Sequence, residues 1–211
     1  MANFQEFEKD PKVILQKIES LRAQGYDRIH IPGGTSKDGS FYAGAFLCHY
    51  DRETKQFFFV GLPYNSSFYK TEDEKNGHTK RQGETPEECA VRETIEESGL
   101  QIKKEDLIVA LEFSVNDRVR IGQKHWKHFY YTEVFSGNLF TFDGPNPIDG
   151  ETAAPIMIPA SLLVEVLFPG HLSAFLNVVE KLCSKSLEYM DSLMSSYEQL
   201  KVKIQQFRKP K

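Results

Sequence analysis

Five glutamates gather in one short stretch of the chain, TPEECAVRETIEESGL at residues 85–100. Glu93 lies three residues before Glu96 and four before Glu97, so a helix here would place these three carboxylates on one side. Like charges at this spacing repel one another and weaken an isolated helix by about 0.2–0.5 kcal/mol per pair. A hard divalent cation such as Mg²⁺ or Mn²⁺ would offset the repulsion, because these ions take carboxylate oxygens as ligands. The alternative is a solvated acidic face, which the spacing of the glutamates alone favours.

The order of the residues around these glutamates changes that interpretation. A glutamate is followed by seven residues, an Arg-Glu pair, two residues, a Glu-Glu pair, one residue, a glycine and an apolar residue: Glu84, Arg92, Glu93, Glu96, Glu97, Gly99 and Leu100. This order resembles the signature of the Nudix hydrolases at every charged position. The resemblance implies an α/β/α sandwich with a mixed sheet, and this α+β fold class is the one we expect, over roughly residues 38–180.

Two positions depart from the signature. Six residues rather than five separate Gly77 from Glu84, so His78 stands where many members of the family have the second glycine of a pair. A backbone carbonyl of this loop often joins the metal shell in the family, and the departure leaves that contact without an assigned residue. Thr94 stands where an apolar residue is usual, which costs a little burial.

The resemblance implies a role for each charged residue of the motif. Glu96 and Glu97 would hold the divalent ions, Mg²⁺ or Mn²⁺. Glu93 would be a further metal ligand or the base that deprotonates the attacking water. Glu84 would be another ligand or an anchor of its loop, and Arg92 would hold Glu93 or the loop by a charge-assisted hydrogen bond.

Other candidate site residues lie outside the motif. Family members often have a further acid in a loop across the site, as base or outer ligand, and Glu151 in DGETAAPIMIP is our candidate for it. Glu112 and Glu133 are weaker candidates because each falls within an expected strand. Basic and aromatic side chains would bind the rest of the substrate, since arginine reaches phosphates and aromatic rings stack on bases. The candidates are Lys80, Arg81, Arg118, Arg120 and Trp126, with ordinary solvated loops as the alternative.

The implied function is metal-dependent hydrolysis of the diphosphate bond in a nucleoside diphosphate linked to another group. The metal ions would neutralise the phosphates and lower the pKa of a bound water. One alternative is a catalytically silent nucleotide-binding sensor that signals through a C-terminal helix, and the intact acidic set argues against it. Another is an interaction protein that acts through the apolar stripe at 172–207.

Local patterns predict the elements that position these residues. Asp10 and Pro11 begin a helix that ends at Gly25, and the acidic helix runs from Pro86 after an N-cap at Thr85 to a stop at Gly99. The stripe at 172–207 predicts one long helix or two consecutive ones. Strands are expected within the ranges 40–64 (a hairpin), 106–115, 124–135, 138–142 and the start of 155–167, which continues into a helix.

Composition bounds the remaining expectations. The chain has 211 residues, a net charge of −4 and 40% hydrophobic residues, which suits a folded chain and disfavours broad binding to nucleic acid. No apolar run is long enough for a membrane span, the N-terminus has no apolar signal region, and three scattered cysteines suit the cytoplasm. We expect an N-terminal segment at residues 1–37, a catalytic domain at 38–183 and an amphipathic C-terminal helix at 184–211. This helix is expected to make a homodimer.

Overall fold

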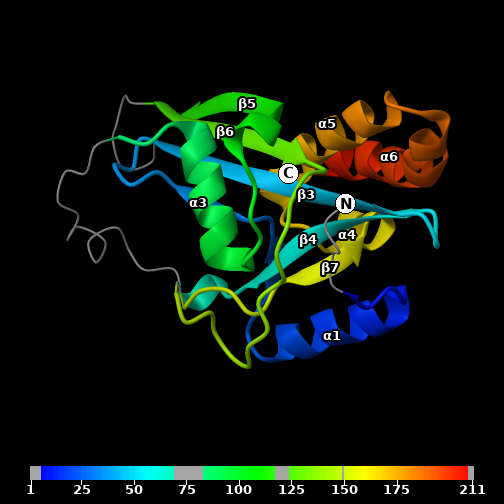
Figure 1. Ribbon diagram of the computed structural model, residues 1–211, viewed down its shortest axis with the longest axis horizontal. Helices are drawn as coiled ribbons and strands as arrows, with labels where there is room; N and C mark the ends of the chain where they lie inside the picture. The colour runs from blue at the N-terminus through cyan, green and yellow to red at the C-terminus, as the bar shows by residue number, and fades with distance from the viewer. Residues whose placement is uncertain (1–5, 69–82, 117–123, 149, 209–211) are drawn as a thin grey trace.

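A mixed β-sheet lies at the centre of the chain, as a computed structural model shows for residues 6–68, 83–116, 124–148 and 150–208 (Figure 1). The strand order is β1-β4-β3-β6-β5, with β2 paired to β3 and β7 paired to β4. Strands β3 and β6 are parallel and the other pairs are antiparallel. The bounds are β1 (Arg28–His30), β2 (Gly33–Thr35), β3 (Phe41–Asp51), β4 (Gln56–Tyr64), β5 (Ile108–Asn116), β6 (Lys124–Thr132) and β7 (Ile156–Pro159).

Helices cover both faces of this sheet. The side chain of Tyr130 on β6 points to α3 (Pro86–Ser98), where its hydroxyl donates to Glu87 at 3.1 Å. The next residue, Tyr131, points to the opposite face, where Lys185 lies over its ring between α5 (Leu172–Cys183) and α6 (Leu187–Arg208). Successive residues of a strand face opposite sides of a sheet, so α3 and the α5–α6 pair form separate layers. The expected α/β/α sandwich with a mixed sheet is confirmed.

The apolar stripe near the C-terminus forms two helices. The break falls at residues 184–186, and Ser186 begins α6 by accepting a hydrogen bond from the Tyr189 amide at 3.1 Å. Helix α6 folds back along α5 and α4 (Ala160–Val166), and buries Leu193 and Leu200 completely. The stripe is therefore the contact between α6 and the rest of the same chain.

The N-terminal part of the chain joins the same sheet. Helix α1 (Pro11–Ala23) has the expected cap, with Asp10 accepting from the Lys12 amide at 2.8 Å, and it packs against β7. After it, β1 pairs with β4 and β2 pairs with β3. Three short 3₁₀ helices, η1 (Ser66–Phe68), η2 (Lys104–Asp106) and η3 (Pro169–His171), connect other elements. Within the described ranges, no helix is long and apolar enough to cross a membrane.

The strand expected at residues 138–142 is wrong, because this stretch is a loop. The Phe140 amide donates to the carbonyl of Ser98 at 3.0 Å, and this carbonyl is one of the acceptors left open at the end of α3. A Cβ atom on Gly99 would lie 2.7 Å from the Phe140 ring. Capping the end of α3 therefore takes the place of strand pairing in this segment.

Candidate functional site

Helix α3 is fixed at both ends by its own sequence. The Thr85 hydroxyl accepts from the Glu88 amide at 3.3 Å, and the Glu88 carboxylate accepts from the Thr85 amide at 3.0 Å, which completes a capping box. Pro86 takes the first helical position, and Gly99 ends the helix in the left-handed conformation with φ 78°. These local signals hold Glu93, Glu96 and Glu97 at defined positions on the helix.

One guanidinium gathers three of the motif's carboxylates. Arg92 Nε and Nη2 donate to the two oxygens of Glu84 at 3.0 and 2.8 Å. Arg92 Nη1 donates to Glu93 at 2.6 Å and to Glu96 at 3.0 Å. We call Arg92, Glu84, Glu93 and Glu96 the Arg92 cluster. With three carboxylates and one guanidinium, it keeps a net negative charge.

Burial and charge act in opposite directions on the pKa values in this cluster. Burial opposes the charged form of Arg92, but the hydrogen bonds and charges of Glu84 and Glu93 raise its pKa above the usual value. Burial also works against ionised Glu84, but hydrogen bonds from Arg92 and from the Lys37 amide lower its pKa. For Glu93, burial outweighs the attraction of Arg92 and raises the pKa. Burial therefore opposes the ionisation of Glu93.

Strand β2 lies against the same carboxylates. The Gly33 amide donates to Glu97 Oε2 at 2.8 Å, and a Cβ atom on Gly34 would lie 2.5 Å from the carboxylate of Glu93. Two residues after β2, the Lys37 amide donates to Glu84 Oε1 at 2.9 Å. The acidic face of α3 thus packs against backbone rather than against side chains.

The donor chemistry of this site fits a hard divalent cation, since carboxylate oxygens are the ligands that Mg²⁺ and Mn²⁺ prefer. Within the described ranges, however, no three His, Cys, Asp or Glu side chains converge as the ligands of one metal ion do. Arg92 accounts for this arrangement, because it is the counter-charge toward which Glu84, Glu93 and Glu96 turn. A bound cation would share this role for Glu93 and Glu96.

The other expected site residues lie apart from the Arg92 cluster or outside the described ranges. Glu151 accepts a hydrogen bond from the Tyr64 hydroxyl at 3.3 Å, at the end of β4. Trp126 is the third residue of β6, with its side chain half exposed, and its ring stacks on that of His128 at 6.2 Å. The residues that fall outside the described ranges are Gly77, His78, Lys80, Arg81, Arg118 and Arg120.

Sequence reasoning missed a polar group on the α5 side of the sheet. The rings of His30 and His171 lie 5.1 Å apart, and the Tyr42 ring lies 6.0 Å from that of His171. Three of their polar atoms, His30 Nε2, His171 Nδ1 and the Tyr42 hydroxyl, are buried without a hydrogen-bond partner among the described residues. Lys127 Nζ lies 5.2 Å from the centroid of the Tyr42 ring. We call these four residues the His30 cluster.

Electrostatics connects the His30 cluster to the acidic motif. Burial, followed by the charge of Arg28, lowers the pKa of His30 to about 4, and burial together with His30 lowers that of His171 well below 6.5. Burial raises the pKa of Tyr42, and the negative charges of Glu97 and Glu93 add to this rise. Both histidines are thus neutral near pH 7, and Tyr42 lies between them and the carboxylates.

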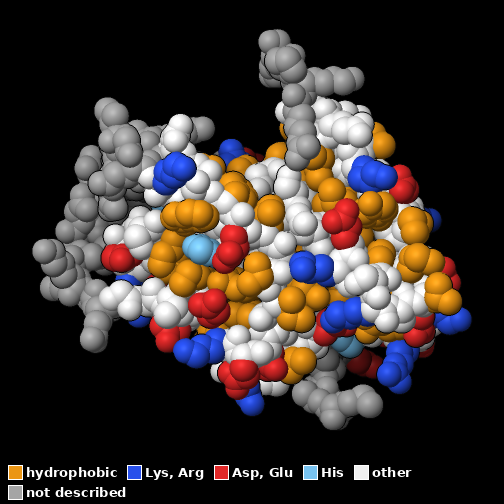
Figure 2. All heavy atoms as spheres, turned by 90° about the horizontal axis from the view of Figure 1, so that it is seen from above, with side chains coloured by type: hydrophobic (Ala, Val, Ile, Leu, Met, Phe, Trp, Pro, Cys, Tyr) orange, Lys and Arg blue, Asp and Glu red, His pale blue; other side chains and the backbone are white. Residues whose placement is uncertain are grey.

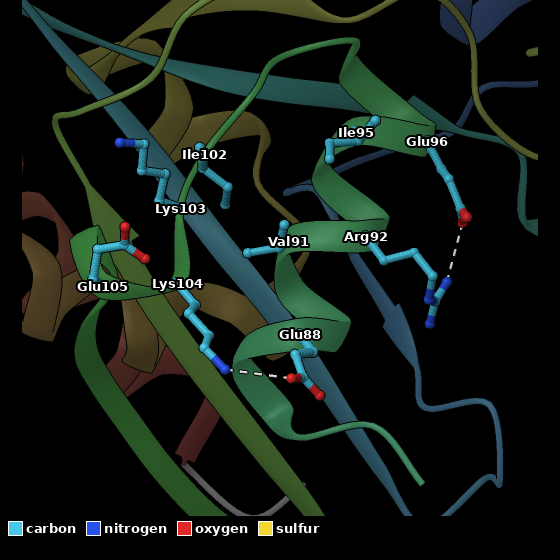
Figure 3. A pocket seen from close by; sticks show the side chains of 9 residues that line it. All are labelled: Glu88, Val91, Arg92, Ile95, Glu96, Ile102, Lys103, Lys104 and Glu105. Carbon is cyan, nitrogen blue, oxygen red and sulfur yellow. Dashed lines mark hydrogen bonds and ion pairs between the residues drawn. The ribbon is translucent and has the colours of Figure 1, made fainter. Parts of the chain in front are cut away.

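A cavity of about 510 Å³ lies on another side of α3 (Figure 3). Val91, Ile95 and Ile102 point into it, and the ion pair of Lys104 with Glu88, at 3.3 Å, lies along its edge. Glu96 stands at the opposite edge, where it pairs with Arg92. The cavity is largely apolar inside, and Glu93 and Glu97 are not among the residues that line it.

Comparison with known proteins identifies part of the chain. Residues 77–159 match the model of the NUDIX domain, from the loop before α3 to the end of β7. This part of the chain is similar to a NUDIX domain. The expected resemblance is confirmed over the matched range, and a Nudix-type pyrophosphohydrolase is the class of enzyme that it supports. Strands β1 to β4 lie outside the matched range.

Solved structures of Nudix proteins are similar to this chain at low identity. A MutT/nudix family protein from Enterococcus faecalis is 16% identical over 79% of this chain and 73% of that one, with a TM-score of 0.41. An Ap4A hydrolase of C. elegans, in a binary complex, is 15% identical over 67% and 98%, with a TM-score of 0.38. The Nudix hydrolase RenU from M. Smegmatis is 16% identical over 72% and 96%, with a TM-score of 0.40. The comparison with curated proteins finds no match.

Proposed function

We propose that this Nudix-like domain hydrolyses the diphosphate bond of a nucleoside diphosphate linked to another group, in a reaction that requires Mg²⁺ or Mn²⁺. The observation that carries the proposal is the Arg92 cluster beside Glu97, in which four carboxylates lie on and next to one capped helix. A diphosphate is also anionic, so a net negative site binds it only with cations between them.

The contacts of each residue support its proposed role. Both oxygens of Glu84 are occupied by Arg92, and one of them also accepts from the Lys37 amide, which supports an anchor of the loop rather than a metal ligand. Glu96 is the most exposed carboxylate of the Arg92 cluster, as an ion ligand on the solvent side would be. With Glu97, it would hold the metal ion.

The proposed reaction uses Glu93 and Arg92 in different ways. A bound divalent ion supplies charge neutralisation of the phosphates and a water of lowered pKa. Glu93 would take the proton of that water or add an oxygen ligand, and its raised pKa favours the proton-accepting role. Arg92 would keep Glu93 oriented through its 2.6 Å hydrogen bond. Glu151 remains our candidate for a further base, with Tyr64 as its positioning partner.

The His30 cluster is a candidate contact for the anionic or polar part of the substrate. Lys127 makes no ion pair with a carboxylate among the described residues, and burial lowers its pKa. Unsatisfied buried polar atoms are expensive, and a ligand or ordered water would satisfy them. We also keep Lys80, Arg81, Arg118, Arg120 and Trp126 as proposed substrate-binding residues.

A panel of substrates tests the proposed function. Product release would be measured for ADP-ribose, dinucleoside polyphosphates, nucleotide sugars and nucleoside triphosphates, with Mg²⁺, with Mn²⁺ and with chelator. Metal-dependent turnover that is lost in Glu97→Gln supports the proposal. Turnover that persists in chelator contradicts it.

One observation favours the alternative of a catalytically silent nucleotide sensor. Glu93 and Glu96 are bound to Arg92, and the described carboxylates do not converge on one point. A sensor would bind one compound of the same panel without converting it. If a compound binds but no product forms with Mg²⁺, with Mn²⁺ or with chelator, the sensor function would be preferred to hydrolysis. Helix α6 would then be the element through which the signal passes.

The remaining expectations are proposals about the whole chain. We propose a small-molecule partner rather than nucleic acid or a membrane, a cytoplasmic location, and the division at residues 37 and 183. On the face that Figure 2 shows, side chains of both charges are interspersed with hydrophobic ones, so this face does not have the basic patch that a binder of a long polyanion presents. We also propose a homodimer through the outer side of α6, where Leu187 and Met194 are exposed.

A further inference from the structure

Strand β2 and the turn after it follow the acidic face of the Nudix-like domain from one end to the other. Gly33 contacts Glu97, Gly34 lies against Glu93, and Lys37 contacts Glu84. As the residue number rises along the strand, the residue number of its partner falls. A single backbone segment therefore meets three of the four carboxylates of the motif.

The contacts of this segment are of two kinds. Main-chain N–H groups donate hydrogen bonds, and the absence of a side chain on glycine leaves space for a carboxylate. Gly33 on β2 and Lys37 in the turn after it each donate a main-chain N–H. Gly34 contributes empty space, since a Cβ atom there would lie 2.5 Å from both Cδ and Oε1 of Glu93. Real Cβ atoms do not approach other atoms so closely, so any other residue would displace this carboxylate.

We infer that Gly34 is a positioning residue of the hydrolase, and that Gly33 supports the same site from β2. This inference rests on the proposed function. Gly34 leaves the room in which the Glu93 carboxylate accepts from Arg92, and from this position Glu93 would help to hold a metal ion. Gly33 holds Glu97 beside it through its N–H group.

The two glycines differ in what a side chain would disturb. A Cβ atom on Gly33 would lie 2.5 Å from the Gly44 Cα atom and 2.8 Å from the Ala43 carbonyl oxygen, so β2 would have to leave β3. The three atoms nearest to a Cβ atom on Gly34 all belong to the far end of the Glu93 side chain, which can rotate away, and the φ angle of Gly34 is not in the left-handed region. Gly34→Ala therefore tests the position of one carboxylate in an otherwise intact fold.

The experiment measures Mn²⁺ binding without substrate, by the loss of the free-ion EPR signal, together with thermal unfolding in chelator. For Gly34→Ala we expect Mn²⁺ affinity to fall by about tenfold or more, as it does when outer partners of metal ligands are changed. The melting temperature in chelator should stay within about 2 °C of the wild type. The control is Gly83→Ala, whose Cβ would meet Asp38 alone among the described residues, at 3.8 Å, and it should resemble the wild type in both measurements.

A double variant separates positioning from a general weakening of the site. In Glu93→Asp the carboxylate retreats by one methylene group, so adding Gly34→Ala to it should cost less than twofold in Mn²⁺ affinity. Equal Mn²⁺ affinity in Gly34→Ala and wild type, an equal loss in Gly83→Ala, or a full loss in the double variant would overturn the inference. Failure of Gly34→Ala to fold would overturn it too, because the backbone would then have taken up the clash. If the wild type does not bind Mn²⁺, this result contradicts the proposed metal-dependent function itself, and not only the role of Gly34.

Discussion

Arg92 binds Glu84 side-on, with Nε and Nη2 each donating to a different carboxylate oxygen at 3.0 and 2.8 Å. Only 9% of the Glu84 side chain and 21% of the Arg92 side chain are exposed. A planar guanidinium matches a carboxylate in this bidentate way, and an ammonium group does not. The pair fixes the loop before α3 to the middle of the helix, so it stabilises the fold as well as the site.

Arg92→Ala should therefore lower both stability and turnover. Removing one partner of a largely buried ion pair costs about 3–5 kcal/mol, because the carboxylates that remain are uncompensated. Urea unfolding and initial rates of the same samples measure the two effects. Arg92→Lys, which keeps the charge and loses the fork, should recover part of the stability and little of the rate. An unchanged rate in Arg92→Ala would reduce the residue to a surface ion pair.

Glu97→Gln should remove most turnover and leave the fold intact. The amide oxygen of glutamine can still accept from the Gly33 amide, but the charge that a cation needs is gone. We expect kcat to fall by roughly 10²-fold, the size of loss typical for one electrostatic contact to the transition state. Glu88→Gln is the matched control on the same helix, since glutamine also completes a capping box. Equal activity of both variants would show that Glu97 is not a ligand.

The capping box of α3 should contribute to stability without contributing to metal binding. Thr85→Ala should lower the free energy of unfolding by about 1 kcal/mol, the usual value of an N-cap side chain. Thr85→Ser retains the hydroxyl and should restore it. Chemical denaturation gives the stability, and Mn²⁺ titration of the folded protein gives the affinity. A tenfold drop in affinity for Thr85→Ala would mean that helix fraying reaches Glu93.

The buried histidines should make the fold less stable as the pH falls from about 6.5 to about 4. The pKa of His30 is lowered from 6.5 to about 4 in the folded chain, so the unfolded chain binds more protons in this window and stability rises with pH. The expected contribution of His30 is on the order of 3 kcal/mol, which is fully present above pH 6.5. His171 adds to it in the same direction. Unfolding curves of His30→Gln should show a smaller change across this window, and an unchanged one would contradict the assignment.

The two sides of α6 should respond differently to substitution. Leu200 is fully buried, so Leu200→Ala should cost about 2–5 kcal/mol of stability. Met194 is 41% exposed, so Met194→Glu should leave the stability nearly unchanged and weaken the proposed homodimer. Sedimentation velocity over a range of concentrations measures the dimer. A wild-type chain that stays monomeric at all of them would exclude self-association through this helix.

Local sequence was sufficient for the parts of the fold that local chemistry determines. Thr85, Pro86 and Gly99 mark the ends of α3 because caps and stops act within one helical turn. The segment at 138–142 was assigned wrongly because its alternation of apolar residues resembles a strand. Its amide at Phe140 instead bonds to the end of α3, a contact that depends on tertiary structure.

The site was predictable only where its residues belong to one motif. The spacing of Glu93 and Glu97 predicts a shared face, which the helix provides. The spacing of these glutamates contains no information on Gly33 and Gly34. The approach of these glycines to the carboxylates is set by the pairing of β2 with β3. Adjacent glycines beside a strand are the one signal that could have indicated a close backbone approach. His30 and His171 lie far apart in sequence, and only the packing of η3 on the sheet brings them together.

The hydrogen bond between Gly33 and Glu97 spans 64 residues, and the whole β3–β4 hairpin lies between its ends. During vectorial synthesis, the ribosome must release the chain beyond α3 before this bond can close. Until then, Arg92 is the nearby counter-charge of the glutamates of α3, although β2 has already left the ribosome. Closing such a long loop costs chain entropy and slows folding, so the ability to hold a metal ion should arise late. A nascent chain would acquire its acidic motif before it acquires the site.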